Sequence, residues 1–457
     1  MLERWFKLKE NGTTVGVEVV GGMTTFFAMA YIIVVNPSIL AFAGVPVGPS
    51  TVATILAAVI ATALMALLAK RPIAGAPYMG ENAFMAFGLA ALGIAWETRL
   101  GALFIAGLAF IALTLFRARA WLANGISKSL KYAFAVGIGL FLTLIGLYET
   151  GIVVSFVSGA EAASLTDAQT GLLRNPNVPL KIGDFRDPKV LLAIAGFVLI
   201  AALMARRVKG AILIGMAATA VVGIALGYAL TPNAIFAMPF VGKYDLGEIA
   251  FKMDLAGVLQ VSMIPIVLTL FLMTFLDTLG TLVGVGAAGG FLDKEGNFRD
   301  IEKPMLADAI ATTISPVLGT STTGAYIESA AGIEEGARTG LAALVTAGLF
   351  AISLFFIPLF EPMQGLAFAY GPALIVVGLL MTRFCIHVDF TDLTEAVPAF
   401  ATILLTVFTY NIANGLVAGL LLYPVMKLLA GKVREIHPAQ IVLAVIGALY
   451  FVSGVVH

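Results

Sequence analysis

Three acidic residues stand in segments of the sequence that otherwise carry few or no charges. Asp277 is the only charged residue between positions 255 and 292. Glu328 lies in a segment rich in Gly, Ser and Thr, and Glu81 precedes Asn82 in a segment rich in Gly and Pro. An ionised, unpaired carboxylate in the middle of a bilayer costs about 3 kcal/mol. These acids therefore either bridge helices or bind something that offsets this cost.

The chemistry that these side chains offer is the binding of protons and of N–H groups. A buried carboxyl group can exchange a proton near neutral pH, and the amide of Asn82 offers a donor and an acceptor to a heteroaromatic ring. The hydroxyl of Thr278 can bond to Asp277, and Phe27 could stack on a ring, although its spacing also fits packing. We interpret this set as a site for a neutral, planar, polar solute that moves with a proton. A purely structural use of Asp277 as a helix bridge, or of Glu81 in a gate, stays open.

The composition indicates which class of protein carries such a site. Of 457 residues, 60% are hydrophobic and 12% are charged, and the formal net charge is zero. Soluble domains carry about 25% charged residues, so this chain has too few charges to cover a soluble surface. This excludes a soluble enzyme, a nucleic-acid-binding protein and a disordered scaffold. We expect a polytopic membrane protein of the all-α class.

Several kinds of chemistry lack their residues in this sequence. One cysteine, Cys385, excludes an internal disulfide and a cysteine metal cluster. The three histidines, His387, His437 and His457, lie outside the expected membrane core, so we expect no metal site. The motif Gly-x4-Gly-Lys-Ser/Thr is absent, so ATP is not expected to drive the protein. We therefore predict no enzyme activity, and no cofactor besides a proton gradient.

Long apolar segments give the number of membrane spans, since a helix needs about 20 apolar residues to cross the hydrocarbon. Fourteen spans are expected, near residues 15–36, 51–69, 73–92, 99–116, 131–149, 189–205, 210–230, 257–286, 304–318, 319–334, 339–358, 367–383, 394–411 and 413–430. A further apolar segment, 439–456, either crosses the membrane or lies in its interface.

The distribution of basic residues orients these spans. With the N-terminus in the cytoplasm, most of the 27 Lys and Arg residues fall in cytoplasmic loops, as the positive-inside rule requires. The exceptions are Arg99, Arg174, Lys181, Arg186, Lys189, Lys243 and Lys252. One missed span would invert every later loop, so this agreement supports the count. We expect a multi-pass protein of the cytoplasmic (inner) membrane.

Fourteen spans divide into two halves of seven, and the odd number inverts the second half relative to the first. The third and tenth spans occupy corresponding places, and both begin with Gly-, Pro- or Thr-rich chain that favours an extended backbone. Their sequences align weakly, as Gly75-Ala-Pro-Tyr78 and Thr323-Gly-Ala-Tyr326. Broken spans and inverted repeats are typical of secondary transporters, which bind substrate at the breaks. The alternative is that both segments are only re-entrant packing elements.

The chain resembles the AzgA-like purine permeases, the adenine–guanine–hypoxanthine branch of the nucleobase–ascorbate transporter (xanthine/uracil permease) superfamily. Five motifs in order along the chain carry the resemblance: Gly22-Met-Thr-Thr-Phe-Phe through Asn36-Pro37, Tyr78-Met-Gly-Glu-Asn-Ala-Phe84, Phe275-Leu-Asp-Thr-Leu-Gly-Thr281, Ile327-Glu-Ser-Ala-Ala-Gly-Ile333 with Arg338-Thr-Gly340, and Glu395-Ala-Val-Pro-Ala-Phe400 through Tyr410-Asn-Ile-Ala-Asn-Gly415.

The resemblance implies fourteen spans in two inverted repeats, with short antiparallel strands in spans 3 and 10 and substrate between them. It implies a core domain of spans 1–4 and 8–11 (15–116 and 257–358) and a gate domain of spans 5–7 and 12–14 (131–230 and 367–430). It also implies proton symport and a homodimer. The binding residues it implies are Asn82, Asp277 and Glu328.

The full candidate set for substrate binding is Asn82, Asp277, Glu328, Thr278, Phe27, Ala83 and Thr323. Glu328 and Asp277 are also the candidate proton carriers. One position departs from the family pattern, which often has a second Asp where Thr274 stands here. This departure leaves the proton stoichiometry and the preferred purine open, and Glu81 stands without an assigned role.

The first hypothesis is a proton-coupled permease that imports purine bases by alternating access. A second keeps the fold and changes the cargo to uracil, xanthine or an organic anion. Acids at the site argue against an anion, because helix N-termini there would otherwise attract it. A third, a membrane-embedded enzyme or a channel, lacks a nucleophile–base pair or a histidine cluster in the spans.

Overall fold

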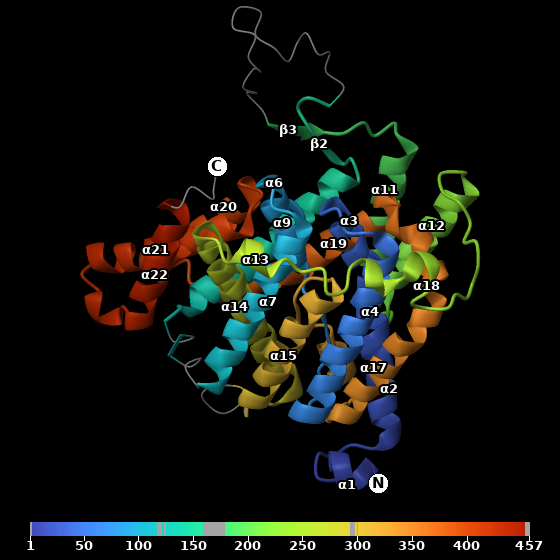
Figure 1. Ribbon diagram of the computed structural model, residues 1–457, viewed down its shortest axis with the longest axis horizontal. Helices are drawn as coiled ribbons and strands as arrows, with labels where there is room; N and C mark the ends of the chain where they lie inside the picture. The colour runs from blue at the N-terminus through green and yellow to red at the C-terminus, as the bar shows by residue number, and fades with distance from the viewer. Residues whose placement is uncertain are drawn as a thin grey trace, which may run out of the picture.

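The computed structural model describes residues 2–116, 121–122, 125–158, 179–292, 298 and 300–452. Figure 1 shows the N-terminus at one end of the molecule and the β2–β3 hairpin at the opposite end. In the first half the elements are α1 (Leu2–Phe6), α2 (Val15–Met29), α3 (Ile32–Phe42), α4 (Val47–Leu64), η1 (Met65–Ala69), β1 (Gly75–Pro77), α5 (Met79–Ala83), η2 (Phe84–Gly88), α6 (Leu89–Ala91), α7 (Trp96–Leu115), α9 (Lys128–Glu149), β2 (Val153–Ser155), β3 (Leu180–Ile182), α11 (Pro188–Ala205) and α12 (Ala211–Ala225).

The second half repeats the pattern of long helices around one broken span. Its elements are η3 (Gly242–Tyr244), η4 (Leu246–Glu248), α13 (Leu255–Val258), η5 (Val261–Met263), α14 (Ile264–Gly289), α15 (Glu302–Leu318), β4 (Thr323–Ala325), α16 (Ser329–Glu334), α17 (Gly340–Ser353), η6 (Leu354–Phe356), α18 (Ile357–Gln364), α19 (Ala367–Thr382), η7 (Arg383–His387), α20 (Leu393–Phe408), α21 (Ile412–Leu429), η8 (Val433–Glu435) and α22 (Pro438–Val452).

The helices account for the predicted spans. Within the described ranges, nine helical segments are long and apolar enough to cross a membrane, and three shorter apolar helices include α12 and α20. The remaining spans are α15 and the two broken segments, β1 with α5 and β4 with α16. The predicted all-α membrane fold with short strands in spans 3 and 10 is confirmed.

The first span differs from its predicted limits. The sequence predicted that this span ends at residue 36, but α3 continues through Pro37 to Phe42, and the helix is interrupted at residues 30–31. A proline inside a helix leaves the carbonyl four residues earlier without its N–H donor. Here that carbonyl, on Ile33, accepts a hydrogen bond from Nε2 of Gln364 at 3.0 Å. The partner from another helix lets α3 tolerate its proline.

The two broken spans meet at one short antiparallel sheet. Strands β1 and β4 pair with Gly75 opposite Ala325 and Pro77 opposite Thr323. The backbone bonds continue on both sides, since the Tyr78 N–H donates to Thr322 O at 2.8 Å and the Tyr326 N–H to Ala74 O at 2.9 Å. The antiparallel pairing follows from the inversion of the halves, because corresponding segments then run in opposite directions.

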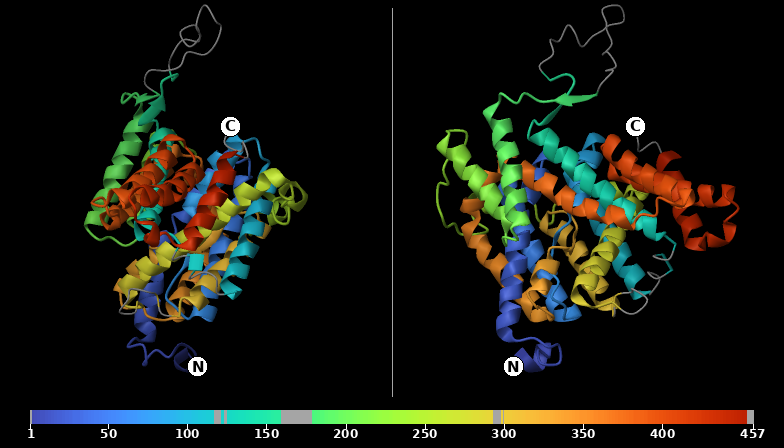
Figure 2. Two further views of the ribbon diagram at one scale, coloured as in Figure 1. Left: turned by 90° about the vertical axis from the view of Figure 1, so that its left-hand side faces the viewer. Right: turned by 180° about the vertical axis from the view of Figure 1, so that it is seen from behind.

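The contacts divide the long helices into two groups. The core group contains α2, α3, α4, α7, α14, α15 and α17, and the gate group contains α9, α11, α12, α19, α20 and α21. Figure 2 shows the gate group beside the core group in its left-hand view. The predicted division into core and gate domains that move as units remains a prediction.

A buried acid fixes one contact inside the core group. Glu18 of α2 has no exposed surface. Its two oxygens accept hydrogen bonds from the N–H groups of Arg338 (2.8 Å), Thr339 and Ala342 (3.1 Å), and from the Thr339 hydroxyl (2.8 Å). These donors cluster at the start of α17, where free N–H groups favour negative charge. Glu18 therefore caps α17 and joins it to α2.

The C-terminal helix and the longest loop are described only in part. Helix α22 packs against α21 and α14, and Nε2 of Gln440 donates to Leu420 O at 2.9 Å. The last residues of the predicted segment 439–456, and residues 159–178 between β2 and β3, lie outside the described residues.

Candidate functional site

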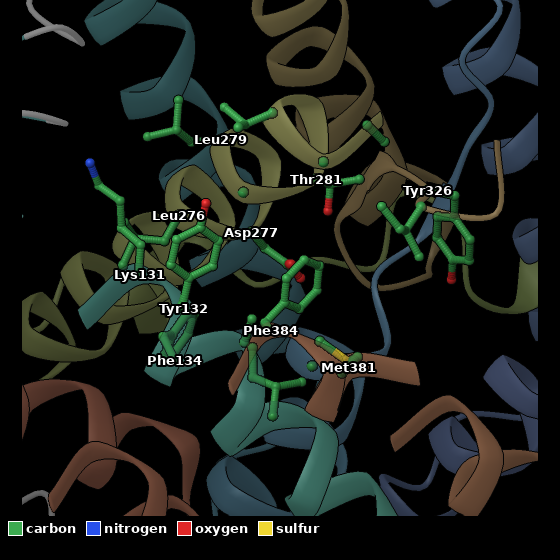
Figure 3. Close-up of a pocket in the computed structure, with 18 of the residues that line it drawn as sticks. Lys131, Tyr132, Phe134, Leu276, Asp277, Leu279, Thr281, Tyr326, Met381 and Phe384 are labelled. Atoms are coloured by element: carbon green, nitrogen blue, oxygen red, sulfur yellow. The ribbon is translucent and has the colours of Figure 1, made fainter. Parts of the chain in front are cut away.

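A cavity of about 540 Å³ lies between the core group and the gate group. Its core side is formed by α14, by the chain from β4 to α16, and by the start of α5; its gate side is formed by α9, α19 and η7. Figure 3 shows Asp277, Thr281 and Tyr326 from the core side, with Met381 and Phe384 from the gate side. A pocket of this volume with few polar groups is typical of a small-molecule site.

Glu328 lines this cavity at the point where β4 gives way to α16. It is the residue immediately before the helix, and its Oε1 accepts a hydrogen bond from the Tyr31 hydroxyl at 2.7 Å. Tyr31 occupies the break between α2 and α3 and also lines the cavity. The hydroxyl of Tyr326 donates to the carbonyl of Pro77 and ties the two strands together. The break between α2 and α3 thus supplies the Tyr31 hydroxyl, and the break between β4 and α16 carries the Glu328 carboxyl group that accepts from it.

Asp277 reaches the same cavity from the long helix α14. The helix is uninterrupted at this point, so the carboxyl group sits on a rigid element. Its neighbour Thr278 turns away from the cavity and is fully buried. The Thr278 hydroxyl accepts from Tyr78 Oη at 3.2 Å and donates to Asp308 Oδ2 of α15. Asp277 and Glu328 are thus the two predicted acids that the structure brings to one space.

Asn82 lies behind the wall of the cavity rather than in it. It is fully buried, and its Nδ2 donates to Asn36 Oδ1 at 2.6 Å. Nδ2 of Asn36 in turn donates to Thr54 at 2.8 Å and to Thr320 at 3.0 Å. In this conformation the amide braces α5 against α3 and does not line the cavity.

The other members of the predicted set also lie away from the cavity lining. Ala83 and Thr323 are fully buried, and the carbonyl of Thr323 accepts from Thr312 Oγ1 at 2.5 Å. Phe27 is 42% exposed on α2 and packs against Phe26 with ring centroids 5.4 Å apart. Their roles in binding stay predictions. The chain around the strands is tightly packed, because a Cβ on Gly324 would overlap the ring of Tyr78.

Two functional candidates escaped the sequence analysis. Asp308 is 1% exposed within α15, and the reasoning applied to Asp277 would have found it, because it is an acid inside a predicted span. Tyr31 carried no such signal, because its position depends on the interruption between α2 and α3, which the sequence analysis did not predict. Among the described residues, no group of three or more His, Cys, Asp or Glu side chains could hold a metal ion.

The gate side of the cavity ends in basic and aromatic residues. Lys128, Lys131 and His387 line it. Tyr132 stacks on Phe384 with centroids 6.0 Å apart and lies 4.8 Å from the His387 ring. These residues stand at the start of α9 and the end of η7, so the cavity extends along the gate group to one end of these helices.

Comparison with known proteins identifies relatives along the whole chain. The family model Xan_ur_permease, described as a permease family, matches residues 16–418. The permease PbuO of Bacillus subtilis, named a guanine/hypoxanthine permease, is 39% identical over 98% of this chain and 99% of its own length. The adenine permease AdeP of Escherichia coli is 37% identical over 99% of this chain and 96% of its own.

Solved structures share the fold. The transmembrane domain of the cyanobacterial bicarbonate transporter BicA superposes with a TM-score of 0.59 at 17% identity, covering 88% of this chain and 97% of that domain. Murine Slc26a9, an anion transporter captured facing inward, gives 0.60 at 12% identity over 92% of this chain and 68% of its own. These neighbours have the fold of inverted repeats that the sequence predicted. The relatives are permeases rather than enzymes, and this chain belongs to their family, the Xan_ur_permease family of membrane transport proteins, as its five motifs indicated.

Proposed function

We propose that this protein imports purine bases (adenine, guanine and hypoxanthine) together with protons, by alternating access of one central site. Two of the relatives described above are named for purine bases. The observation that carries the proposal is the convergence of Glu328 and Asp277 on one cavity between the core and gate groups. A neutral base with several N–H groups is a better partner for two carboxyl groups than an anion is.

Each acid has a separate part in the proposed mechanism. Glu328, oriented by the Tyr31 hydroxyl at 2.7 Å, accepts N–H groups at one edge of the base. Asp277 faces the same space from α14 and takes up a proton when the base binds. Pairing a carboxylate with a proton and with N–H donors removes most of the cost of its burial. The site that holds base and proton can then move between the two sides of the membrane without exposing a net charge.

The direction of opening follows from the proposed orientation, in which the N-terminus is cytoplasmic. Lys128 and His387 then lie at cytoplasmic helix ends, and the cavity that they line opens inward. Movement of the core group against the gate group would close this path and open the other. We further propose that the protein resides in the inner membrane as a homodimer.

A uracil or xanthine cargo is the nearest alternative, because the same two acids could bind either base. An organic anion is less well matched, although the fold neighbours include anion carriers, because Glu328 and Asp277 would repel it. The lysines and the histidine line the outer part of the cavity on the gate side and do not neutralise these acids in any ion pair among the described residues.

The direct experiment is uptake of radiolabelled hypoxanthine in cells that lack their own purine transporters. We expect saturable uptake that an uncoupler abolishes and that excess adenine, guanine or hypoxanthine suppresses. Glu328→Gln should reduce concentrative uptake at least 100-fold at equal membrane abundance. Glu334→Gln, the same change at an exposed position of α16, is the matched control and should transport normally. Normal accumulation by Glu328→Gln, or competition by uracil alone, would refute the proposal.

A further inference from the structure

Glu81 stands out among the buried acids because nothing in the proposed mechanism uses it. It lies in the first turn of α5, within the broken third span, and has no exposed surface. Neither of its carboxyl oxygens has a hydrogen-bond partner among the described residues. The hydroxyl of Thr274, a residue that acts on the Glu81 carboxyl group, donates to Leu270 O at 3.0 Å.

The groups that act on Glu81 are acids and phenols. Asp277 of α14 and Asp308 of α15 are within electrostatic range, as are the phenols of Tyr78 and Tyr326. The elements packed against α5 are α3, η2, α9 and α14. Neither α3 nor η2 contains a charged residue, and the charged residues of α9 stand in its first and last turns. No described basic side chain therefore compensates Glu81.

In the conformation that the structure describes, an acid in this setting carries a proton. An ionised carboxylate without donors, buried beside two further acids, is strongly unfavourable in a medium of low dielectric constant. A metal cation would also compensate the charge, but the described acids do not converge closely enough to ligate one. The neutral carboxylic acid remains, and it holds one proton in a place that the cavity does not touch.

The neighbouring acids link Glu81 electrostatically to the cavity. Asp277 lines the cavity and lies within electrostatic range of Glu81. Asp308, whose Oδ1 has no partner in the described part of the chain, is linked through Thr278 to the Tyr78 hydroxyl. Any charge change on Asp277 therefore acts directly on Glu81.

We propose that Glu81 is a second proton-carrying residue, so that two protons move with each base. The inference rests on the proposed proton-coupled import. Water in the cavity protonates Asp277, Asp277 passes the proton to Glu81, and a second proton then occupies the substrate site. Release on the other side reverses both transfers, so protons are conserved and no covalent bond to the base forms.

The test is the zero-flux voltage of the purified protein in proteoliposomes at equal pH on both sides. For a neutral base, a tenfold gradient is balanced by about 60 mV if one proton moves and by about 30 mV if two move. We expect about 30 mV for the unmodified protein and about 60 mV for Glu81→Gln. Glu248→Gln, at an exposed position outside the helix groups, should keep the unmodified value.

Two further variants keep the test decisive. Glu81→Asp retains a titratable group and should stay near 30 mV. In the Glu81→Gln background, Thr274→Asp places an acid on the residue that faces position 81 and should restore about 30 mV. An unmodified protein balanced at about 60 mV, or a Glu81→Gln variant unchanged from it, overturns the role of Glu81 and leaves proton-coupled import standing. Flux that ignores voltage and pH in the unmodified protein refutes the proposed function itself.

Discussion

Glu18 of α2 and Glu81 of α5 are both fully buried acids, yet their surroundings differ in kind. Glu18 accepts hydrogen bonds from three backbone N–H groups and one hydroxyl at the start of α17. Glu81 has no hydrogen-bond partner in the described residues and faces Asp277 and Asp308. One carboxyl group is held by donors, and the other needs a proton.

This difference distinguishes an acid that is buried for a structural reason from one that is buried for a functional reason. Hydrogen bonds to a charged group contribute about 1.5–3 kcal/mol each, and an unsatisfied buried group costs a similar amount. Glu18 therefore stabilises the α2–α17 contact, whereas Glu81 lowers stability. An acid that costs stability and lies beside a substrate cavity is the pattern expected of a proton-binding site.

The largest expected effect is on folding, from Glu18→Ala. The change leaves the N–H groups of Arg338, Thr339 and Ala342 buried without an acceptor, so we expect a loss of about 3–5 kcal/mol. Thermal unfolding of the detergent-solubilised protein should shift to markedly lower temperature. Glu10→Ala, at an exposed site in the same N-terminal region, serves as the control. An unchanged unfolding temperature for Glu18→Ala would remove the contrast between the two acids.

The opposite sign is expected for Glu81→Leu. Replacing an unpaired buried acid by an apolar side chain of similar size should stabilise the protein by about 1–4 kcal/mol. The same unfolding assay should therefore show a higher transition temperature, while transport loses one proton per base. A lower transition temperature would mean that Glu81 is held by interactions comparable with those of Glu18.

Much of this arrangement could be predicted from the sequence, for a physical reason. The spans follow from apolar length and from the distribution of basic residues. The strands follow from the Gly-, Pro- and Thr-rich starts of spans 3 and 10. Two acids of the cavity follow from their place in apolar segments. All of these are local properties of the sequence. The Asn36–Asn82 amide pair joins residues of two helices, and no local pattern reports it. The Tyr31–Glu328 bond spans the two halves of the chain, and it depends on an interruption of the first span that no local pattern indicated. Asp308 could have been predicted by the reasoning used for Asp277, because it is an acid inside a predicted span.

A moderate effect on KM is expected from removing the hydroxyl that donates to Glu328. Tyr31→Phe removes the hydroxyl that donates to Glu328 at 2.7 Å and should raise KM about 5–10-fold, which corresponds to about 1–1.4 kcal/mol. The maximal rate should change less, because the carboxyl group itself remains. Tyr370→Phe removes a hydroxyl that donates to Glu149 at 3.2 Å inside the gate group and should leave KM unchanged. Equal effects of the two variants would show that Tyr31 has no specific part in binding.

The smallest effect on stability is expected for Asp392, an acid outside the membrane spans that pairs with Lys432. The Lys432 ammonium, 2.6 Å away, and the Thr394 hydroxyl hold the pKa of Asp392 well below its usual value. A lowered folded-state pKa contributes stability above the unfolded value of about 3.9, and this contribution is lost as pH falls further. Asp392→Asn should therefore flatten the decline of the unfolding temperature below about pH 4 and matter little at pH 7. An unfolding temperature that falls below pH 4 as steeply in Asp392→Asn as in the unmodified protein would count against this ion pair.

The central claim is that Glu328 and Asp277 bind the base and a coupling proton in one cavity. Its most direct test is proton movement recorded with a pH-sensitive dye sealed inside proteoliposomes, after hypoxanthine is added outside. We predict acidification of the interior that follows base uptake and disappears in Glu328→Gln, while Glu334→Gln behaves as the unmodified protein. Uptake of hypoxanthine with no change of internal pH would contradict the account.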